Sequence, residues 1–167
     1  RVADFTRDPY GRFMNFYTNI PYLGTSIPAE KMKGALKGIP AILCGAGPSL
    51  DKQLPLLSAL TDRAFLLAPS SSMNPLVNTS VIPHLGGGID PTKGQLSRLL
   101  ARGGNDVPLL YSDFFNHPAF LEWQGPKLHL AKESSYGVSQ WFEGKLGISQ
   151  NETMISGAST SNYLLEA

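Results

Sequence analysis

The sequence predicts an α/β fold with a mostly parallel sheet, covered by helices on both faces, in three layers. Short apolar runs of strand length alternate with longer amphipathic stretches from Ile39 onward. A glycine-rich turn at residues 45–47 follows the first apolar run and precedes a helical pattern. The chain has 167 residues, which corresponds to about one domain.

The first 38 residues differ from the rest and are predicted to form a helical lead-in. Residues 9–19 place Tyr10, Phe13, Phe16 and Tyr17 near helical spacing, and this aromatic stripe is typical of a core or an interface. Residues 26–37 begin with Ser-Ile-Pro and end in a basic turn, a pattern that favours a second helix. The predicted organisation is therefore a lead-in, residues 1–38, and a main domain, residues 39–167.

The main domain is predicted to contain five strands joined by helices. The expected strands are residues 39–44, 64–68, 107–111 and 127–130, with one more inside 81–89, where three consecutive glycines interrupt it. The expected helices are residues 51–60, 72–78, 92–101, 134–146 and 159–166. Strands separated by helical crossovers imply a doubly wound parallel sheet.

Composition and charge exclude several classes of function. The 14 basic and 13 acidic residues give a net charge of +1, which argues against binding to nucleic acid or to an anionic membrane surface. No apolar stretch is long enough to span a bilayer. The single cysteine, Cys44, lies in an apolar run and is expected to be buried and inert, which fits a cytoplasmic protein. The chain starts at Arg1 and not at Met, and it ends at Ala167 inside an apparently helical pattern, so it is interpreted as a C-terminally truncated piece of a longer protein.

The turn after the first predicted strand has the strongest chemical pattern. Glycines there let a ligand approach the main chain, and the free amides at a helix start attract phosphate. Ligands of open parallel sheets bind at the carboxyl ends of the strands. The alternative is an ordinary strand-to-helix turn, because the third glycine of a dinucleotide-binding loop is replaced by Leu50. The candidate nucleotide-binding residues here are Gly45, Ala46, Gly47, Pro48, Ser49 and Asp51.

A second candidate is Asp90, which follows the third predicted strand at the same sheet edge. Its carboxylate could accept a ribose hydroxyl, bind a divalent ion or act as a base. The competing interpretation is a helix cap, because Asp90-Pro91 precedes a helical pattern.

A third candidate lies at residues 156–162, where small hydroxyl residues precede a helical pattern. Such a segment can bind an anion or simply cap the helix. His84, His117 and His129 lack metal-ligand spacing and are interpreted as surface or internally satisfied residues. No metal site is predicted.

These residues resemble a known family. The segment 40–52, Pro-Ala-Ile-Leu-Cys-Gly-Ala-Gly-Pro-Ser-Leu-Asp-Lys, resembles the signature of the 6-hydroxymethylpterin diphosphokinase MptE-like family, which includes the motility accessory factors, glycosyltransferases of flagellin. The lead-in at residues 15–21, the Asp90 position and residues 156–159 are similar as well. Ala158 in place of a glycine, and the triple glycine at 86–88, depart from the family pattern.

The resemblance implies a Rossmann-like domain with a nucleotide or nucleotide-sugar ligand. It implies that Gly45, Gly47, Pro48 and Ser49 line the phosphates, that Asp90 lies at the reaction centre or the ribose, and that Gly157 and Ser159 close the pocket. No cofactor is assigned from the residues themselves.

Three functions follow as expectations. The first is a glycosyltransferase that moves a nonulosonic, sialic-acid-like sugar from a CMP-sugar to a protein Ser or Thr, with flagellin as an implied acceptor and Asp90 as the base. The second is a 6-hydroxymethyl-7,8-dihydropterin diphosphokinase, which would use ATP and magnesium held by carboxylates such as Asp51 and Asp90. The third is a non-catalytic interaction domain that retains the fold.

Overall fold

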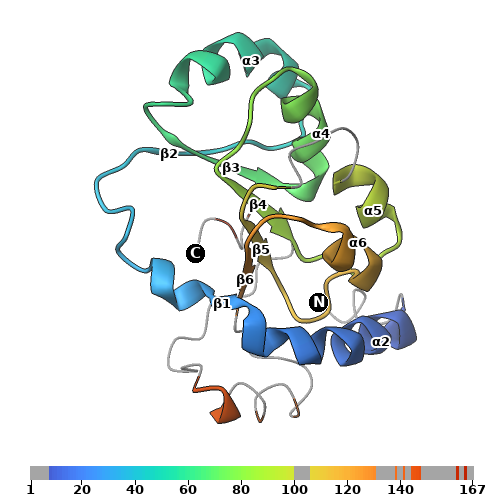
Figure 1. The fold of residues 1–167 in the computed structure, drawn as a ribbon. Coiled ribbons are helices and arrows are strands. Elements are labelled where there is room, and N and C mark those ends of the chain that lie inside the picture. Colours follow the sequence, from blue (N-terminus) through green and yellow to red (C-terminus); the bar gives the residue numbers. More distant parts are fainter. Residues whose placement is uncertain are drawn as a thin grey trace.

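The centre of the protein is a six-stranded sheet in which all neighbouring strands are parallel, in the order β1-β6-β5-β4-β3-β2 (Figure 1). The computed structural model describes residues 8–99, 106–130, 138, 141, 144–147, 161 and 164. The strands are β1 (Ile27–Pro28), β2 (Ala41–Leu43), β3 (Phe65–Pro69), β4 (Leu85–Gly88), β5 (Leu109–Tyr111) and β6 (Lys127–His129). The predicted parallel α/β fold is confirmed.

The helices that connect these strands gather on one face of the sheet. They are α3 (Ser49–Leu60), α4 (Ser70–Asn78), α5 (Gly94–Leu99) and α6 (His117–Glu122). From β2 to β6 the chain always steps in the same direction, so right-handed crossovers place all four helices on the same side. Their apolar side chains share one core with Leu66, Ala68 and Leu109. The sequence predicted a doubly wound sheet, in which the crossovers divide between the two faces. From β2 to β6 the sheet is instead wound in one direction.

The opposite face of the sheet is covered by the two ends of the described chain. Leu67, Leu85 and Leu110 alternate with the side chains of the first core and point to this face. They pack in a cluster with Ala29 of the short 3-10 helix η2 (Ala29–Met32) and with Leu164. The sheet is therefore the middle of three layers, as predicted. Among the described residues, no helix combines the length and apolar character needed to cross a membrane.

The lead-in differs from its prediction between residues 26 and 37. These residues form β1, η2 and turns instead of a helix, and β1 pairs with β6 through Ile27 and Leu128. Pairing with the sheet edge outweighs the local helical pattern, and Gly34, at a φ of +76°, has a backbone conformation that no helix contains. The lead-in thus supplies an edge strand, so the sheet extends across the predicted boundary at residue 38.

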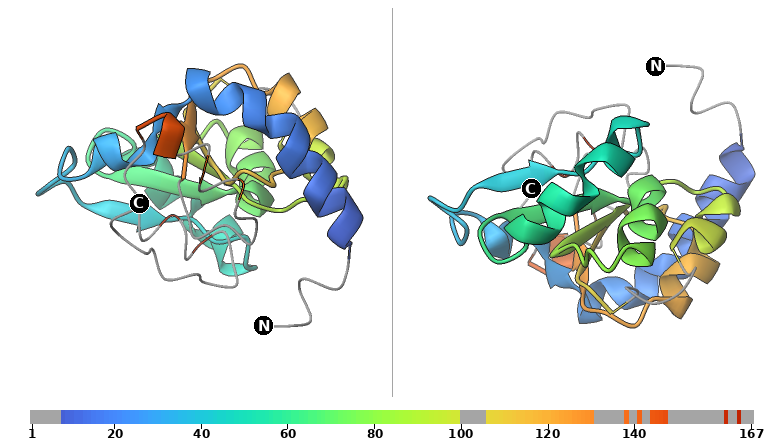
Figure 2. Two further views of the ribbon diagram at one scale, coloured as in Figure 1. Left: turned by 90° about the horizontal axis from the view of Figure 1, so that it is seen from below. Right: turned by 90° about the horizontal axis from the view of Figure 1, so that it is seen from above.

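The first part of the lead-in is helical, as predicted. Helix α2 (Pro9–Asn19) is capped by the Asp8 carboxylate, which accepts the Gly11 amide at 2.8 Å, and it continues into the 3-10 helix η1 (Ile20–Thr25). Phe16 is fully buried, whereas Tyr10 and Tyr17 are exposed. The two further views in Figure 2 show α2 lying along one side of the sheet domain.

The predicted helices near the C-terminus fall largely outside the described residues. Within residues 134–146, the structure describes residues 138, 141, 144 and 145 as helical. Within residues 159–166, it describes residues 161 and 164 as helical.

The triple glycine forms the body of β4 and does not interrupt it, contrary to the prediction. All three glycines are buried, and the close approach of the Phe115 ring explains the absence of a side chain at Gly88. A Cβ atom at Gly88 would lie 2.7 Å from Phe115 Cε2, whereas one at Gly86 would meet Met73 Sδ at 3.5 Å, an ordinary contact.

We expect Gly88→Ala to lower the free energy of unfolding by about 1–3 kcal/mol, the usual cost of overpacking a core. Urea denaturation measures this loss, with Gly86→Ala in the same strand as the matched control. Equal stability of the two variants would contradict the assigned packing of Phe115 on β4.

His129, at the end of β6, is 1% exposed and packs beside the ring of Tyr111. Burial lowers the pKa of His129 to about 4. The unfolded chain, with an ordinary histidine pKa near 6.5, therefore binds this proton before the folded chain does. The contribution of His129 to the free energy of unfolding should be fully present above about pH 6.5. It should be lost, by ~3 kcal/mol, as the pH drops toward 4.

Urea denaturation between pH 7 and pH 4.5 measures this dependence. In His129→Leu the part of the pH dependence that comes from His129 should disappear. An unchanged slope in that variant would show that other groups carry the dependence.

Candidate functional site

The loop between β2 and α3 lies at the carboxyl edge of the sheet, where the sequence predicted a nucleotide site. Cys44 at its start is buried, and residues 45–49 are all exposed. The Cys44 amide donates to Leu67 O at 2.8 Å, which continues the pairing of β2 with β3, and the Leu50 amide donates to Gly47 O at 2.9 Å. Between these two bonds, the amides of Gly45, Ala46 and Gly47 have no acceptor among the described residues. They are available to an incoming anion.

The loop also leaves space for a ligand to approach the main chain. A Cβ atom built at Gly45 would meet nothing within 4 Å, and one at Gly47 would meet only Ser49 Oγ at 3.8 Å. Neither glycine is among the residues with positive φ, so their role is to leave room and not to permit an unusual backbone. Helix α3 begins at Ser49, and its 12 residues direct the positive end of the helix dipole at this space. Asp51 is exposed in its first turn.

Asp90 follows β4 at the same edge of the sheet and caps the turn that leads into α5. Its Oδ1 accepts the Thr92 amide at 2.9 Å, and its Oδ2 accepts Gln95 Nε2 at 2.9 Å. Asp90 thus orders the turn before α5, but the helix begins at Gly94 and not at Thr92, so Asp90 is not the residue that directly precedes it, as the capping interpretation expected. The carboxylate is partly exposed and is held in a fixed orientation. Its role toward a ligand stays a prediction.

The Gly45–Ser49 loop and Asp90 are brought together by the sheet. Only β3 separates β2 from β4, and all three strands run parallel. Neighbouring strands lie about 4.8 Å apart, so the two loops start roughly 10 Å from each other. The third candidate segment, with Gly157 and Ser159, lies outside the described residues.

Helix α2 supplies residues at this edge that the sequence prediction missed. Asn15 Nδ2 donates to Pro91 O at 2.9 Å, next to Asp90, and Asn15 Oδ1 accepts the His117 amide at 3.1 Å. Asn19, one turn further along, is fully buried, and its Nδ2 donates to Asp113 O and Phe115 O at 2.9 and 2.8 Å. Two asparagines spaced i and i+4 share one helix face. This spacing is the feature of the sequence that could have indicated a polar contact on that face of α2.

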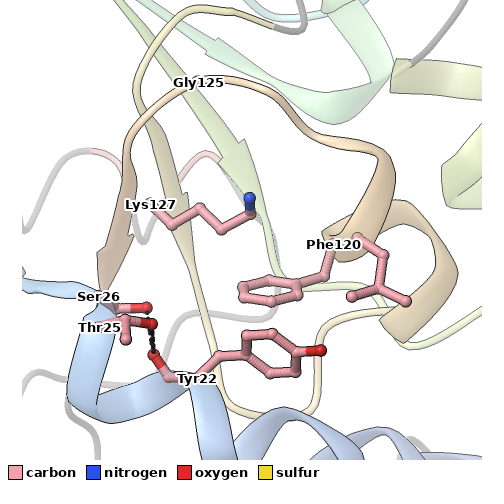
Figure 3. Close-up of a pocket in the computed structure, with 7 residues that line it drawn as sticks. Tyr22, Thr25, Ser26, Phe120, Gly125 and Lys127 are labelled. Carbon is pink, nitrogen blue, oxygen red and sulfur yellow. Dashed lines mark hydrogen bonds between the residues drawn. The ribbon is translucent and has the colours of Figure 1, made fainter.

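Two cavities lie beside the described lead-in rather than at the glycine loop. The smaller, about 300 Å³, lies at the amino ends of β1 and β6 between Tyr22, Phe120 and Lys127 (Figure 3). Lys127 Nζ donates to Trp123 O at 2.7 Å and lies 5.0 Å from the centre of the Phe120 ring. Burial lowers the pKa of Lys127. The larger cavity, about 720 Å³, is lined by α2, η1, His117 and Val138.

The remaining predicted features are structural. Cys44 is 3% exposed, and burial raises the pKa of its thiol, as expected for an inert residue. His84 Nδ1 accepts the Leu66 amide at 3.0 Å. In the part of the chain that the structure describes, no three His, Cys, Asp or Glu residues are grouped so that they could hold a metal ion.

The comparisons with known proteins agree with this fold. Residues 14–167 match the sequence model of the family described as 6-hydroxymethylpterin diphosphokinase MptE-like. The fold is similar to the solved structure of a MAf glycosyltransferase from Magnetospirillum magneticum AMB-1, with a TM-score of 0.60 and 14% sequence identity. The match covers 77% of this chain and 21% of that protein, so this chain spans about a fifth of its length. No curated protein matches the sequence significantly.

Proposed function

Because this chain belongs to the 6-hydroxymethylpterin diphosphokinase MptE-like family, we propose that it is a nucleotide-dependent transferase domain whose donor binds at the Gly45–Ser49 loop. The proposed donor is a CMP-linked nonulosonic sugar, and the proposed acceptor is a Ser or Thr hydroxyl of a protein such as flagellin. The observation that carries the proposal is that the amides of Gly45, Ala46 and Gly47 have no acceptor among the described residues, beside open space at Gly45 and Gly47.

The loop supplies the chemistry that sugar transfer from a nucleotide requires. Negative charge grows on the donor phosphate as its bond to the sugar breaks. Main-chain amides and the α3 dipole would stabilise this charge without reorganising, since the backbone already holds them in place. Asp90, about two strands away, would contact the ribose or accept a proton from the acceptor. Asp51, on the first turn of α3, would lie at the edge of the same site.

A sugar donor is favoured over ATP by the similarity to a glycosyltransferase structure, which shares the fold across most of this chain. The family description itself names a pterin diphosphokinase, so pyrophosphoryl transfer from ATP with magnesium is the second candidate. The two functions require different donors at the same loop.

Isothermal titration calorimetry with the purified protein separates the two candidates. We expect heat of binding with CMP and with CMP-linked nonulosonic sugars, and none with ATP and magnesium. Binding of ATP with magnesium but of no CMP compound would favour the diphosphokinase. No binding of either donor would support a non-catalytic domain.

A further inference from the structure

Gln95 is a fully buried polar side chain that α5 places against Asp90. It is the second residue of the helix, and none of it is exposed. Its Nε2 donates to Asp90 Oδ2 at 2.9 Å. A carboxylate oxygen accepts hydrogen bonds and does not donate them, so the amide nitrogen of Gln95, and not its amide oxygen, faces Asp90.

The amide oxygen of Gln95 has no donor from the protein interior. Oε1 is buried and accepts no hydrogen bond from the part of the chain that the structure describes. The neighbouring Leu96 and Leu99 of α5 pack in the main hydrophobic core. Burying an amide oxygen without a donor costs free energy of folding, and a methionine at position 95 would avoid this cost. Packing therefore does not account for a glutamine here, whereas the hydrogen bond to Asp90 does.

The bond from Gln95 fixes an orientation that the turn before α5 does not require. The Thr92 amide already holds Asp90 Oδ1 at 2.9 Å, and the Gln95 amide donates to Thr92 O at 3.1 Å, which closes the turn. A carboxylate held at one oxygen can still rotate about its Cβ–Cγ bond, where the torsional preference is weak. Because Gln95 holds Oδ2, both oxygens are held. The carboxylate is thus fixed although it is partly exposed.

The main chain at Asp90 is held by other elements as well. The Asn116 amide, just before α6, donates to Asp90 O at 3.2 Å, and Asn15 of α2 donates to Pro91 O at 2.9 Å. The side chain and the main chain of Asp90 are therefore both ordered before a ligand arrives. A group that is already fixed loses less conformational entropy when a ligand binds to it.

We propose that Gln95 is a positioning residue that holds Asp90 ready to accept the ribose hydroxyls of the nucleotide donor. This inference rests on the proposed transferase function, in which the donor phosphate lies at the Gly45–Ser49 loop. A carboxylate repels the phosphate but accepts hydrogen bonds from the 2′ and 3′ hydroxyls of the adjoining ribose. Only β3 separates the strand before Asp90 from the strand before the loop, so one nucleotide has both within its surroundings.

Calorimetry with two nucleotides tests the positioning role. CMP carries both ribose hydroxyls, and 2′,3′-dideoxycytidine monophosphate lacks both. We expect Gln95→Met to raise the Kd of CMP by about 3- to 10-fold, since the loosened Asp90 side chain must then be immobilised on binding, and to leave the Kd of the dideoxy nucleotide unchanged. An unchanged Kd of CMP, or an equal change for both nucleotides, would overturn the proposal.

Two further variants separate positioning from packing. Asn74→Leu is the matched control, because it removes an amide hydrogen bond to Ser97 O of the same helix and leaves the bonds to Asp90 intact. It should bind CMP with the wild-type Kd. In an Asp90→Ala background, Gln95→Met should have no further effect on the Kd of CMP, because no carboxylate remains to be held. The same loss of affinity in both backgrounds would show that Gln95 acts through the packing of α5, and would overturn the proposal.

A third measurement needs no nucleotide. Once Oδ2 is released, rotation of the Asp90 carboxylate should break the bond from the Thr92 amide part of the time. Hydrogen exchange of that amide should therefore be about 3-fold faster or more in Gln95→Met than in the wild type. Unchanged exchange would overturn the positioning role. Faster exchange in the variant, with a wild type that binds no CMP, would mean that Gln95 positions Asp90 but that the proposed transferase function fails.

Discussion

Replacing Trp123 with alanine should lower the free energy of unfolding by about 3–5 kcal/mol, the cost of removing a large buried aromatic side chain. Trp123 is 1% exposed and packs in the core between the sheet and its helices. Its Nε1 donates to Val107 O at 2.9 Å, just before β5. The variant therefore loses buried apolar contacts and also leaves a buried carbonyl group without its donor.

The chain contains its own control for this experiment. Trp141 is 57% exposed, and Trp141→Ala should change stability by less than about 0.5 kcal/mol, as is usual for surface positions. Urea denaturation followed by circular dichroism measures both variants without relying on tryptophan fluorescence. Similar losses of unfolding free energy in the two variants would show that the core is not centred on the face of the sheet that carries α3 to α6.

Replacing Gly47 with valine should weaken binding of the CMP-sugar donor by about 100-fold or more without unfolding the protein. The added side chain would point into the open space in which the donor phosphate is proposed to lie. Displacing a phosphate from two main-chain amides removes two charge-assisted hydrogen bonds, at about 1.5–3 kcal/mol each. The loop itself should tolerate the change, because only Ser49 Oγ lies within 4 Å of the new Cβ.

Gly144→Val is the matched control for this prediction. Gly144 is exposed, and a Cβ atom added there would meet nothing within 4 Å. It also lies far along the chain from the loop. Calorimetry gives the Kd of both variants, and circular dichroism gives their stability. If Gly47→Val bound the donor as tightly as Gly144→Val, the donor phosphate would not lie against this loop.

The order of elements in the main domain could be predicted from the sequence, because short segments of the chain show where strands and helices form. Apolar runs of strand length mark β3, β5 and β6, and the stretches between them mark the crossovers. The face on which the helices lie could not be predicted. It depends on the spatial order of the strands, and no local pattern shows that β2 to β6 follow each other across the sheet.

Long-range contacts explain the predictions that were wrong. Residues 26–37 carry a helical pattern, but β6 offers a sheet edge to Ile27 and Pro28, and pairing with it decides their conformation. The triple glycine looks like a break in a strand, yet Gly88 is a position where the Phe115 ring excludes a side chain. In both cases the deciding partner is distant in sequence.

The candidate site could be predicted only in part, because some of its contacts also join residues that are distant in sequence. The glycine loop and Asp90 are visible because each directly follows a strand, and parallel strands end at a common edge. The contact between Asn19 and His117 joins residues 98 positions apart, so composition and spacing do not reveal it. Only the packing of α2 on α6 brings the two side chains together.

The most direct test of the account is a titration of CMP followed through the backbone amide resonances of Gly45, Ala46 and Gly47. The account predicts that these three amides shift downfield more than any others, because hydrogen bonds to a phosphate would replace those to water. Binding of CMP that leaves all three resonances in place, with the largest shifts around Lys127 or elsewhere, would contradict it.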